Sequence, residues 1–275
     1  MRYRLLVLLF LFGSLCVYAQ EKTALLIVHF GTSYDDTRAK TIDAINAEVI
    51  QAFPDYEVRE AWSSRIIIRK LKAHGVEKFT PVEALIRLRA DGFKHVIVQS
   101  TTLLDGAEME LLRRDIAGVE NLFEEIRIGK PLLFSVDDCR KVADILVNRH
   151  QDAADAKKRS HVVFVGHGTY TPATATYSQM DYLFTEQAGP LFHVATIEGY
   201  PTFESMLGRL KVAKARSVTL VPMLVVAGDH ANNDIAVDWK QALEAKGLQV
   251  ECRLEGLGEI PEIRKIYIEH IRACL

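Results

Sequence analysis

The chain alternates short strand-like segments with longer stretches in which apolar and polar residues follow a helical period. The segments of strand character are 23–28, 56–61, 96–101, 125–128, 162–165, 192–197, 218–224 and 249–254. The patterns between them predict helices over 36–52, 81–89, 108–116, 177–184, 235–245 and 261–274, and others that begin near 135 and 203. Because apolar strands that alternate with helices are typical of parallel sheets covered on both faces, we predict an α/β fold.

Capping residues mark two of the helix starts. The segment Thr80-Pro81-Val82-Glu83 combines a capping box with proline at the first helical position. Ser135, followed by two aspartates, opens a second helix, which we expect to cross between two halves of the molecule.

The two halves are indicated by an internal repeat. A shift of 122 positions places 80–108 over 202–230 without a gap, with six identical residues, and a shift of 137 aligns Gly31-Thr32 with Gly168-Thr169. We therefore predict two similar parallel-sheet halves, 20–134 and 135–275. Ligands of such folds bind beyond the carboxyl ends of the strands, so we expect the site in a cleft between the halves.

The repeat also shows where the halves differ chemically. Phe30 of the first half corresponds to His167, Glu108 to His230, and Trp62 approximately to Glu198. Two histidines and a glutamate suit a borderline divalent ion such as cobalt, nickel, iron or zinc. Three protein ligands would leave coordination positions open, as a catalytic site requires. We predict a metal site in the second half.

Each candidate also has a purely structural interpretation. His167 could form a hydrogen bond within its own turn, and Glu198 could be an acid favoured at a helix start. His230 could belong to a solvated loop in which Asp229 caps the next helix. The comparison with Phe30 and Glu108 argues against these alternatives, because the same turns evidently form without the histidines.

Composition narrows the function further. The formal net charge is −2, and it becomes −4 without residues 1–19, which contain two arginines and no acid. No basic run is present, so we do not expect a nucleic-acid partner. No Walker A motif or dinucleotide fingerprint occurs, so we expect no nucleotide cofactor. Cys139, Cys252 and Cys274 could form one disulfide or could be small buried residues.

The N-terminal segment predicts export. Two arginines precede an apolar run from Leu5 to Cys16, and Ala19 stands at a suitable cleavage point before Gln20. The run is too short to span a bilayer, so residues 1–19 read as a signal peptide and the mature chain would have no membrane span. We expect a periplasmic or otherwise exported protein; lipid attachment at Cys16 is the weaker alternative.

Five motifs together resemble one known family. They are HFGTS at 29–33, GHGT at 166–169, IEGYP at 197–201, AGDHA at 227–231 with Asn233-Asp234, and GLGE at 256–259. In combination they resemble the ATP-independent (class II) tetrapyrrole chelatases, in particular the anaerobic sirohydrochlorin cobaltochelatases of the CbiK type. The resemblance covers about 22–275 and implies a chelatase-like fold with a macrocycle-sized cleft.

The resemblance also implies roles for individual residues. The metal-binding His, Glu and His of the family fall on His167, Glu198 and His230, and His167 would accept a pyrrole proton. The remaining residues assigned to the tetrapyrrole are Phe30 and Trp62 on its face, Glu108, and Tyr200; either Glu108 or Asp229 could relay protons. The implied metal is Co²⁺ as substrate, with Fe²⁺ and Ni²⁺ also suited to these ligands.

Two other functions are compatible with the sequence. An exported haem- or tetrapyrrole-binding protein could reuse the fold without turnover, and it would need one axial histidine rather than a His-Glu-His set. A periplasmic solute-binding protein also has two α/β domains, but that class does not explain the His and Glu positions. The sequence leaves a homo-oligomer open.

Overall fold

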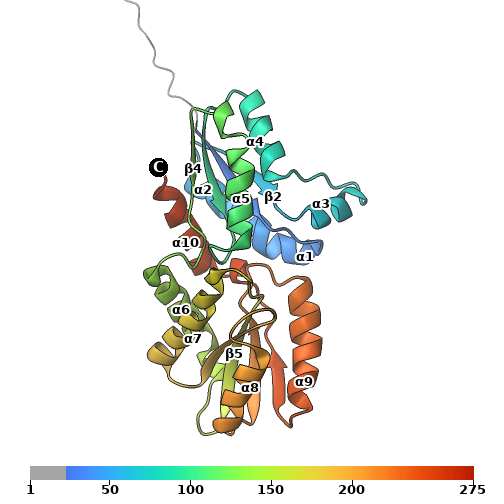
Figure 1. The fold of residues 1–275 in the computed structure, drawn as a ribbon, viewed down its shortest axis with the longest axis vertical. Helices are drawn as coiled ribbons and strands as arrows, with labels where there is room; N and C mark the ends of the chain where they lie inside the picture. Colours follow the sequence, from blue (N-terminus) through green and yellow to red (C-terminus); the bar gives the residue numbers. More distant parts are fainter. Residues whose placement is uncertain (1–22) are drawn as a thin grey trace, which may run out of the picture.

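The computed structural model describes residues 23–275, so the predicted signal peptide, 1–19, lies outside the described residues. Two parallel sheets lie one above the other (Figure 1). The first has the order β2-β1-β3-β4, and its strands are β1 (Thr23–His29), β2 (Glu57–Trp62), β3 (His95–Ser100) and β4 (Glu125–Ile128). The second has the order β6-β5-β7-β8, and its strands are β5 (Ser160–Gly166), β6 (Phe192–Thr196), β7 (Ser217–Pro222) and β8 (Gln249–Cys252).

Helices and helical turns cover both sheets. Those between β1 and β4 are α1 (Asp35–Arg38), η1 (Ala39–Asp43), α2 (Ala44–Ala52), α3 (Arg65–Lys72), α4 (Pro81–Ala90), α5 (Ala107–Ala117) and η2 (Glu120–Leu122). Those that follow are α6 (Val136–His150), η3 (Gln151–Ala153), η4 (Pro172–Thr174), α7 (Ala175–Ala188), α8 (Phe203–Val212), η5 (Ala231–Trp239), α9 (Lys240–Glu244), η6 (Leu257–Glu259) and α10 (Pro261–Arg272). None of these described helices is long and apolar enough to cross a bilayer.

The predicted duplication and α/β class are confirmed. The two sheets have the same strand order, because β5 to β8 take the places of β1 to β4. Every strand pair is parallel. The predicted capping box at Thr80 is present, and its counterpart Thr202 caps α8 through the backbone N–H of Ser205. The repeated residues therefore serve the same local role in both halves.

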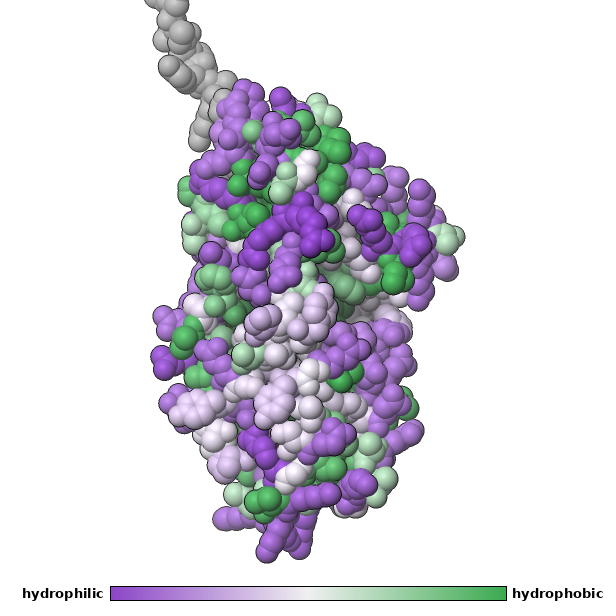
Figure 2. Space-filling view, viewed as in Figure 1, coloured by the Kyte–Doolittle hydropathy of each residue, from purple (hydrophilic) through white to green (hydrophobic). Residues whose placement is uncertain are grey.

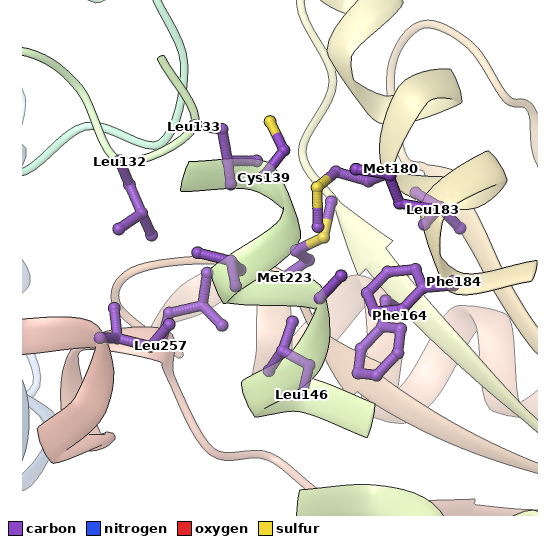
Figure 3. Close-up of a cluster of buried hydrophobic side chains, with 14 of the residues drawn as sticks. Leu132, Leu133, Cys139, Leu146, Phe164, Met180, Leu183, Phe184, Met223 and Leu257 are labelled. Carbon is purple, nitrogen blue, oxygen red and sulfur yellow. The ribbon is translucent and has the colours of Figure 1, made fainter. Parts of the chain in front are cut away.

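Each sheet is buried on both faces, as the apolar strands predict. In β1, Leu26 and Val28 pack toward α4 and α5, and Leu25 and Ile27 pack toward α2. Figure 3 shows one cluster of the second half, in which Phe164 of β5 packs beside residues of α6 and α7. Cys139 belongs to this cluster, and it is unpaired like Cys252 and Cys274, so none of the three forms a disulfide.

The closing helix joins the two halves. Residues near the start of α10, such as Ile263, belong to the core of the second half. Ile268 and Ile271, near its end, pack with Leu25 and Ile27 of the first sheet. The helix that crosses back is therefore α10, whereas α6, which begins after Ser135, packs on the second sheet.

One helix of the first half was missed, and one correspondence between the halves is wrong. Helix α3 was not expected, although Ser64 caps it through the backbone N–H of Ile67 and its apolar residues Ile67, Ile68 and Leu71 recur at a helical spacing. Trp62 does not correspond to Glu198: it pairs with His29 as Thr196 pairs with Gly166. The residue that corresponds to Glu198 is Ser64, because Ser64 N bonds the carbonyl of Phe30 as Glu198 N bonds that of His167.

Buried histidines make the fold sensitive to acid. Burial lowers the pKa of His193 to about 3 and that of His150 to about 4. His161 forms a 2.9 Å Nδ1 to Nε2 hydrogen bond with His193, and burial lowers its pKa as well. These imidazoles are held neutral while the unfolded chain binds protons below about pH 6.5.

We expect the free energy of unfolding to fall as the pH drops from about 6.5 toward 4, by about 3 kcal/mol for His193 at pH 4. His193→Gln should reduce this dependence, and the exposed His74, changed to Gln, should not. Urea unfolding of the wild type and both variants at a series of pH values measures how the free energy of unfolding depends on pH. Identical pH dependence in the wild type and His193→Gln would contradict the assignment.

Candidate functional site

The carboxyl ends of the two sheets meet through reciprocal contacts. Gly106, after β3, approaches Thr169, after β5: a Cβ added to this glycine would lie 3.5 Å from the threonine Oγ1. Gly228, after β7, approaches Thr32, after β1, in the same way, at 3.4 Å. The two contacts are equivalent in the repeat, because Gly106 corresponds to Gly228 and Thr32 corresponds to Thr169. In Figure 2 the surface narrows near this junction, below the projecting α3, and residues of intermediate hydropathy gather there.

His167 stands in a tight turn at the end of β5. A Cβ on Gly166 would lie 2.2 Å from the ring of Tyr177, and a Cβ on Gly168 would lie 1.2 Å from the carbonyl oxygen of Glu198. Gly168 also has φ +94°, which favours glycine. The Tyr177 hydroxyl accepts a hydrogen bond from Gly168 N at 3.2 Å. These close approaches fix the backbone that carries the His167 imidazole.

His230 was expected directly after β7. It lies instead at the start of η5. Its ring is 4.5 Å from that of His167, centroid to centroid, at an interplanar angle of 77°. Its Nδ1 is 2.7 Å from Asp234 Oδ2, one turn further along. The segment Ala231–Trp239 is π-helical, a conformation that is frequent at functional sites.

The hydrogen bonds indicate which ring nitrogens are available. Nδ1 of His167 lies 3.1 Å from the carbonyl oxygen of Gly168, and Nδ1 of His230 faces Asp234. Carbonyl and ionised carboxylate oxygens only accept, so Nδ1 carries the hydrogen in both rings. Each neutral imidazole then has its Nε2 lone pair free for a metal ion or a proton.

Glu108 lies near enough to His167 for the two side chains to interact electrostatically. Its side chain is solvent-accessible, but the surrounding protein raises the pKa of its carboxyl group, and the nearby His167 offsets this only in part. A carboxyl group with a raised pKa holds a proton closer to neutral pH. A relay role for Glu108 stays a prediction.

Glu198 joins the site through its backbone. Its N–H donates to the carbonyl of His167 at 2.7 Å, and its residue is exposed. Among residues 23–275, no three His, Cys, Asp or Glu side chains are close enough together to hold a metal ion. The structure thus brings His167 and His230 together, while the Glu198 carboxylate does not complete a preformed three-ligand cluster.

The aromatic residues predicted to contact a ring differ in accessibility. Phe30 is 50% exposed and Tyr200 is 56% exposed, so both present surface. Trp62 is 0% exposed and packs beneath Gly31, where an added Cβ would lie 2.3 Å from its ring. The expectation that Trp62 contacts a ligand is therefore wrong in this structure, because Gly31 and its neighbours cover the indole.

Sequence reasoning missed three residues around the histidines. Asp234 holds His230, and Tyr177 holds the His167 turn. Tyr34 of the first half donates a 3.0 Å hydrogen bond to Asp229 of the second, beside His230. Only Asp234 had a signal, because Asn233-Asp234 belongs to the motif that contains His230; the contacts of Tyr177 and Tyr34 follow no sequence pattern.

We expect Asp234→Asn to weaken metal binding about 10- to 100-fold, because the carboxylate that orients His230 and fixes its tautomer is lost. Titration of the purified protein with Co²⁺ measures this. Asp238→Asn, in the same segment but exposed, is the matched control and should bind as the wild type does. Equal affinity in both variants would show that Asp234 does not orient the ligand.

Comparison with known proteins shows the family of the chain. The family model described as cobalt chelatase (CbiK) matches residues 23–275. The chain belongs to the cobalt chelatase (CbiK) family. A family relative, the sirohydrochlorin cobaltochelatase of Salmonella typhimurium, is 36% identical over 92% of this chain and 97% of its own length. Another, the sirohydrochlorin cobaltochelatase CbiKC of Nitratidesulfovibrio vulgaris, is 31% identical over 92% and 91%.

Solved structures show the same fold at low identity. SirB from Bacillus subtilis with Fe³⁺ has a TM-score of 0.66 and 16% identity, and it covers 92% of this chain and 95% of that chain. CbiX, described as the terminal enzyme of sirohaem biosynthesis in denitrifying bacteria, has a TM-score of 0.58 and 17% identity, with coverage of 92% and 99%. The predicted chelatase-like fold is thus confirmed.

Proposed function

We propose that this protein inserts a divalent metal ion, Co²⁺ first, into sirohydrochlorin without ATP. The observation that carries the proposal is the pair of facing imidazoles, His167 and His230, each with a free Nε2. The family membership and the two cobaltochelatase relatives support the same reaction. The function is that of a metal chelatase, and the metal ion is a substrate.

The chemistry follows from the residues at the junction. Insertion exchanges one divalent ion for two pyrrole N–H protons, so the site must hold a metal ion and accept protons. His230 and His167 present Nε2 donors, and Glu198 supplies a carboxylate from its exposed loop. Once the metal ion has moved from Nε2 of His167 to the macrocycle, that nitrogen can accept a pyrrole proton and pass it to Glu108, which lies close enough to interact with it. Positioning of two reactants does most of the work, so no nucleotide is needed.

The face of the macrocycle would lie against the first half. Phe30 takes the place of His167 in the repeat and is half exposed, so it offers apolar contact on the side opposite the histidines. Tyr200, on the loop that carries Glu198, adds a second exposed ring. The two halves would then contribute different chemistry to the two faces of one flat substrate.

The test is a spectroscopic insertion assay with sirohydrochlorin and Co²⁺, run beside Ni²⁺ and Fe²⁺ and beside a haem titration. The expected result is turnover with Co²⁺ without added nucleotide. No insertion with any of the three metals, together with tight haem binding, would favour an exported tetrapyrrole carrier instead.

We also propose that the reaction takes place outside the cytoplasm, on the strength of the arginine-led apolar segment before Ala19. N-terminal sequencing of the native protein should find a start near Gln20, with the protein in the periplasmic fraction. An intact Met1 in the cytoplasmic fraction would refute this.

A further inference from the structure

A chain of buried polar side chains lies beneath the first half of the junction. Lys78 forms an ion pair and hydrogen bond with Glu60 of β2, and the side chains are only 17% and 27% exposed. Asn46 of α2 donates to the other oxygen of Glu60 at 2.9 Å, and its Oδ1 lies 2.9 Å from Nε2 of His29. Nδ1 of His29 is 3.0 Å from Thr101 Oγ1.

The donors of this network can be arranged in one consistent order. The Glu60 carboxylate only accepts, so Asn46 turns its amide N–H toward it and its carbonyl toward His29. Nε2 of His29 therefore carries the hydrogen, and Nδ1 accepts from the Thr101 hydroxyl. Burial lowers the pKa of His29 more than its hydrogen bond with Asn46 raises it, so this 1% exposed imidazole is neutral. A network that is satisfied throughout holds its members in place.

The network reaches Phe30, the half-exposed ring that would form a wall for the macrocycle, by two routes. Along the backbone, His29 immediately precedes Phe30. Through the side chains, the Lys78 ammonium lies 4.8 Å from the centre of the Trp62 ring, and that ring packs under Gly31. Burial raises the pKa of the Glu60 carboxyl, but the hydrogen bond and charge of Lys78 outweigh this and lower it, and the nearby Trp62 indole adds a smaller lowering. Phe30 is thus supported from both sides.

The second half forms the same turn without such a network. By strand register Glu60 corresponds to Val194, and His29 to Gly166. There the space is filled by the Tyr177 ring. The same turn can therefore be built without these charges, which points to a role beside Phe30 rather than in the turn. An ion pair of this burial is weak evidence for stability by itself.

We propose that Glu60 is a positioning residue: with Lys78 and Asn46 it holds Trp62 and His29 so that Phe30 presents a preformed wall to the tetrapyrrole. This rests on the proposed chelatase function. Its consequence is specific, because the wall acts on binding of the macrocycle and not on proton transfer at the histidines.

The test uses Glu60→Gln, which keeps the side-chain shape and removes the charge. It is made in a Trp239→Phe background, so that Trp62 is the remaining one of the two tryptophans. We expect KM for sirohydrochlorin to rise about 3- to 10-fold, the factor that one well-placed aromatic contact is worth. We expect kcat within about twofold of the wild type, and red-shifted Trp62 emission in the free protein. Lys78→Met should give the same changes if Glu60→Gln fails to fold.

The matched control is Glu48→Gln. Glu48 pairs with Arg264 at 2.6 Å, and these side chains are 28% and 12% exposed, close to the values of the Glu60 pair. We expect this variant to lose melting temperature while keeping KM and Trp62 emission. If both glutamine variants lose melting temperature alone, or if Glu60→Gln lowers only kcat, the positioning role is refuted. If the wild type inserts no metal, sirohydrochlorin affinity replaces KM and still decides the role of Glu60.

Discussion

Alanine in place of His167 or His230 is expected to lower the rate of metal insertion about 100-fold or more, with the fold intact. Each change removes one of two imidazoles whose ring centroids lie 4.5 Å apart, and the His167 change also removes the proposed base. The repeat provides the structural argument: the first half carries Phe30 and Glu108 at these places, so the histidines are not needed for the backbone.

Single-turnover assays of Co²⁺ insertion, with circular dichroism as the check on folding, measure this effect. His74→Ala, an exposed histidine on the surface of the first half, is the control and should insert metal at the wild-type rate. Turnover that survives both His167→Ala and His230→Ala would place the metal site elsewhere.

Gly168→Ala is expected to be the most damaging small substitution outside the core. The added Cβ would lie 1.2 Å from the carbonyl oxygen of Glu198, and φ is +94°. Because the obstruction is backbone rather than a movable side chain, we expect a loss of more than about 4 kcal/mol in the free energy of unfolding. The His167 turn and the Glu198 loop would separate, and insertion would be lost.

The control for this variant separates backbone strain from crowding. Gly247 has φ +83° and nothing within 4 Å of an added Cβ, so Gly247→Ala should cost only about 1–2 kcal/mol. Denaturant unfolding of both variants gives the comparison. Equal losses would mean that the close approach of the Glu198 loop does not stabilise the turn.

Most of the fold could be predicted from local pattern. The strand segments, the capping box at Thr80 and the ungapped repeat are properties of short stretches, and the structure confirms the two sheets that they imply. The meeting of His167 and His230 could be predicted as well, because parallel strands bring their carboxyl ends to one edge. Helix α3, of eight residues, was missed although Ile67, Ile68 and Leu71 recur at a helical spacing.

Other features depend on which residues meet across the sheets. Whether Trp62 is exposed depends on Gly31 lying over it, and which residue corresponds to Glu198 depends on strand register, which a sequence shift gives only approximately. Neither the burial of Trp62 nor the exact counterpart of Glu198 follows from a period in the sequence.

The sequence by itself determined the duplication, the alternation of strands and helices, and the two histidines that break the symmetry of the halves. These are set by residue order and by backbone geometry that repeats every few residues. The tertiary structure decided the rest: the hydrogen bond that orients His230, the carbonyl that closes the His167 turn, and the Glu60–Lys78 pair beside Trp62. Each of these depends on distances of a few ångströms between side chains or backbone groups, and such distances are set only when the packed elements meet.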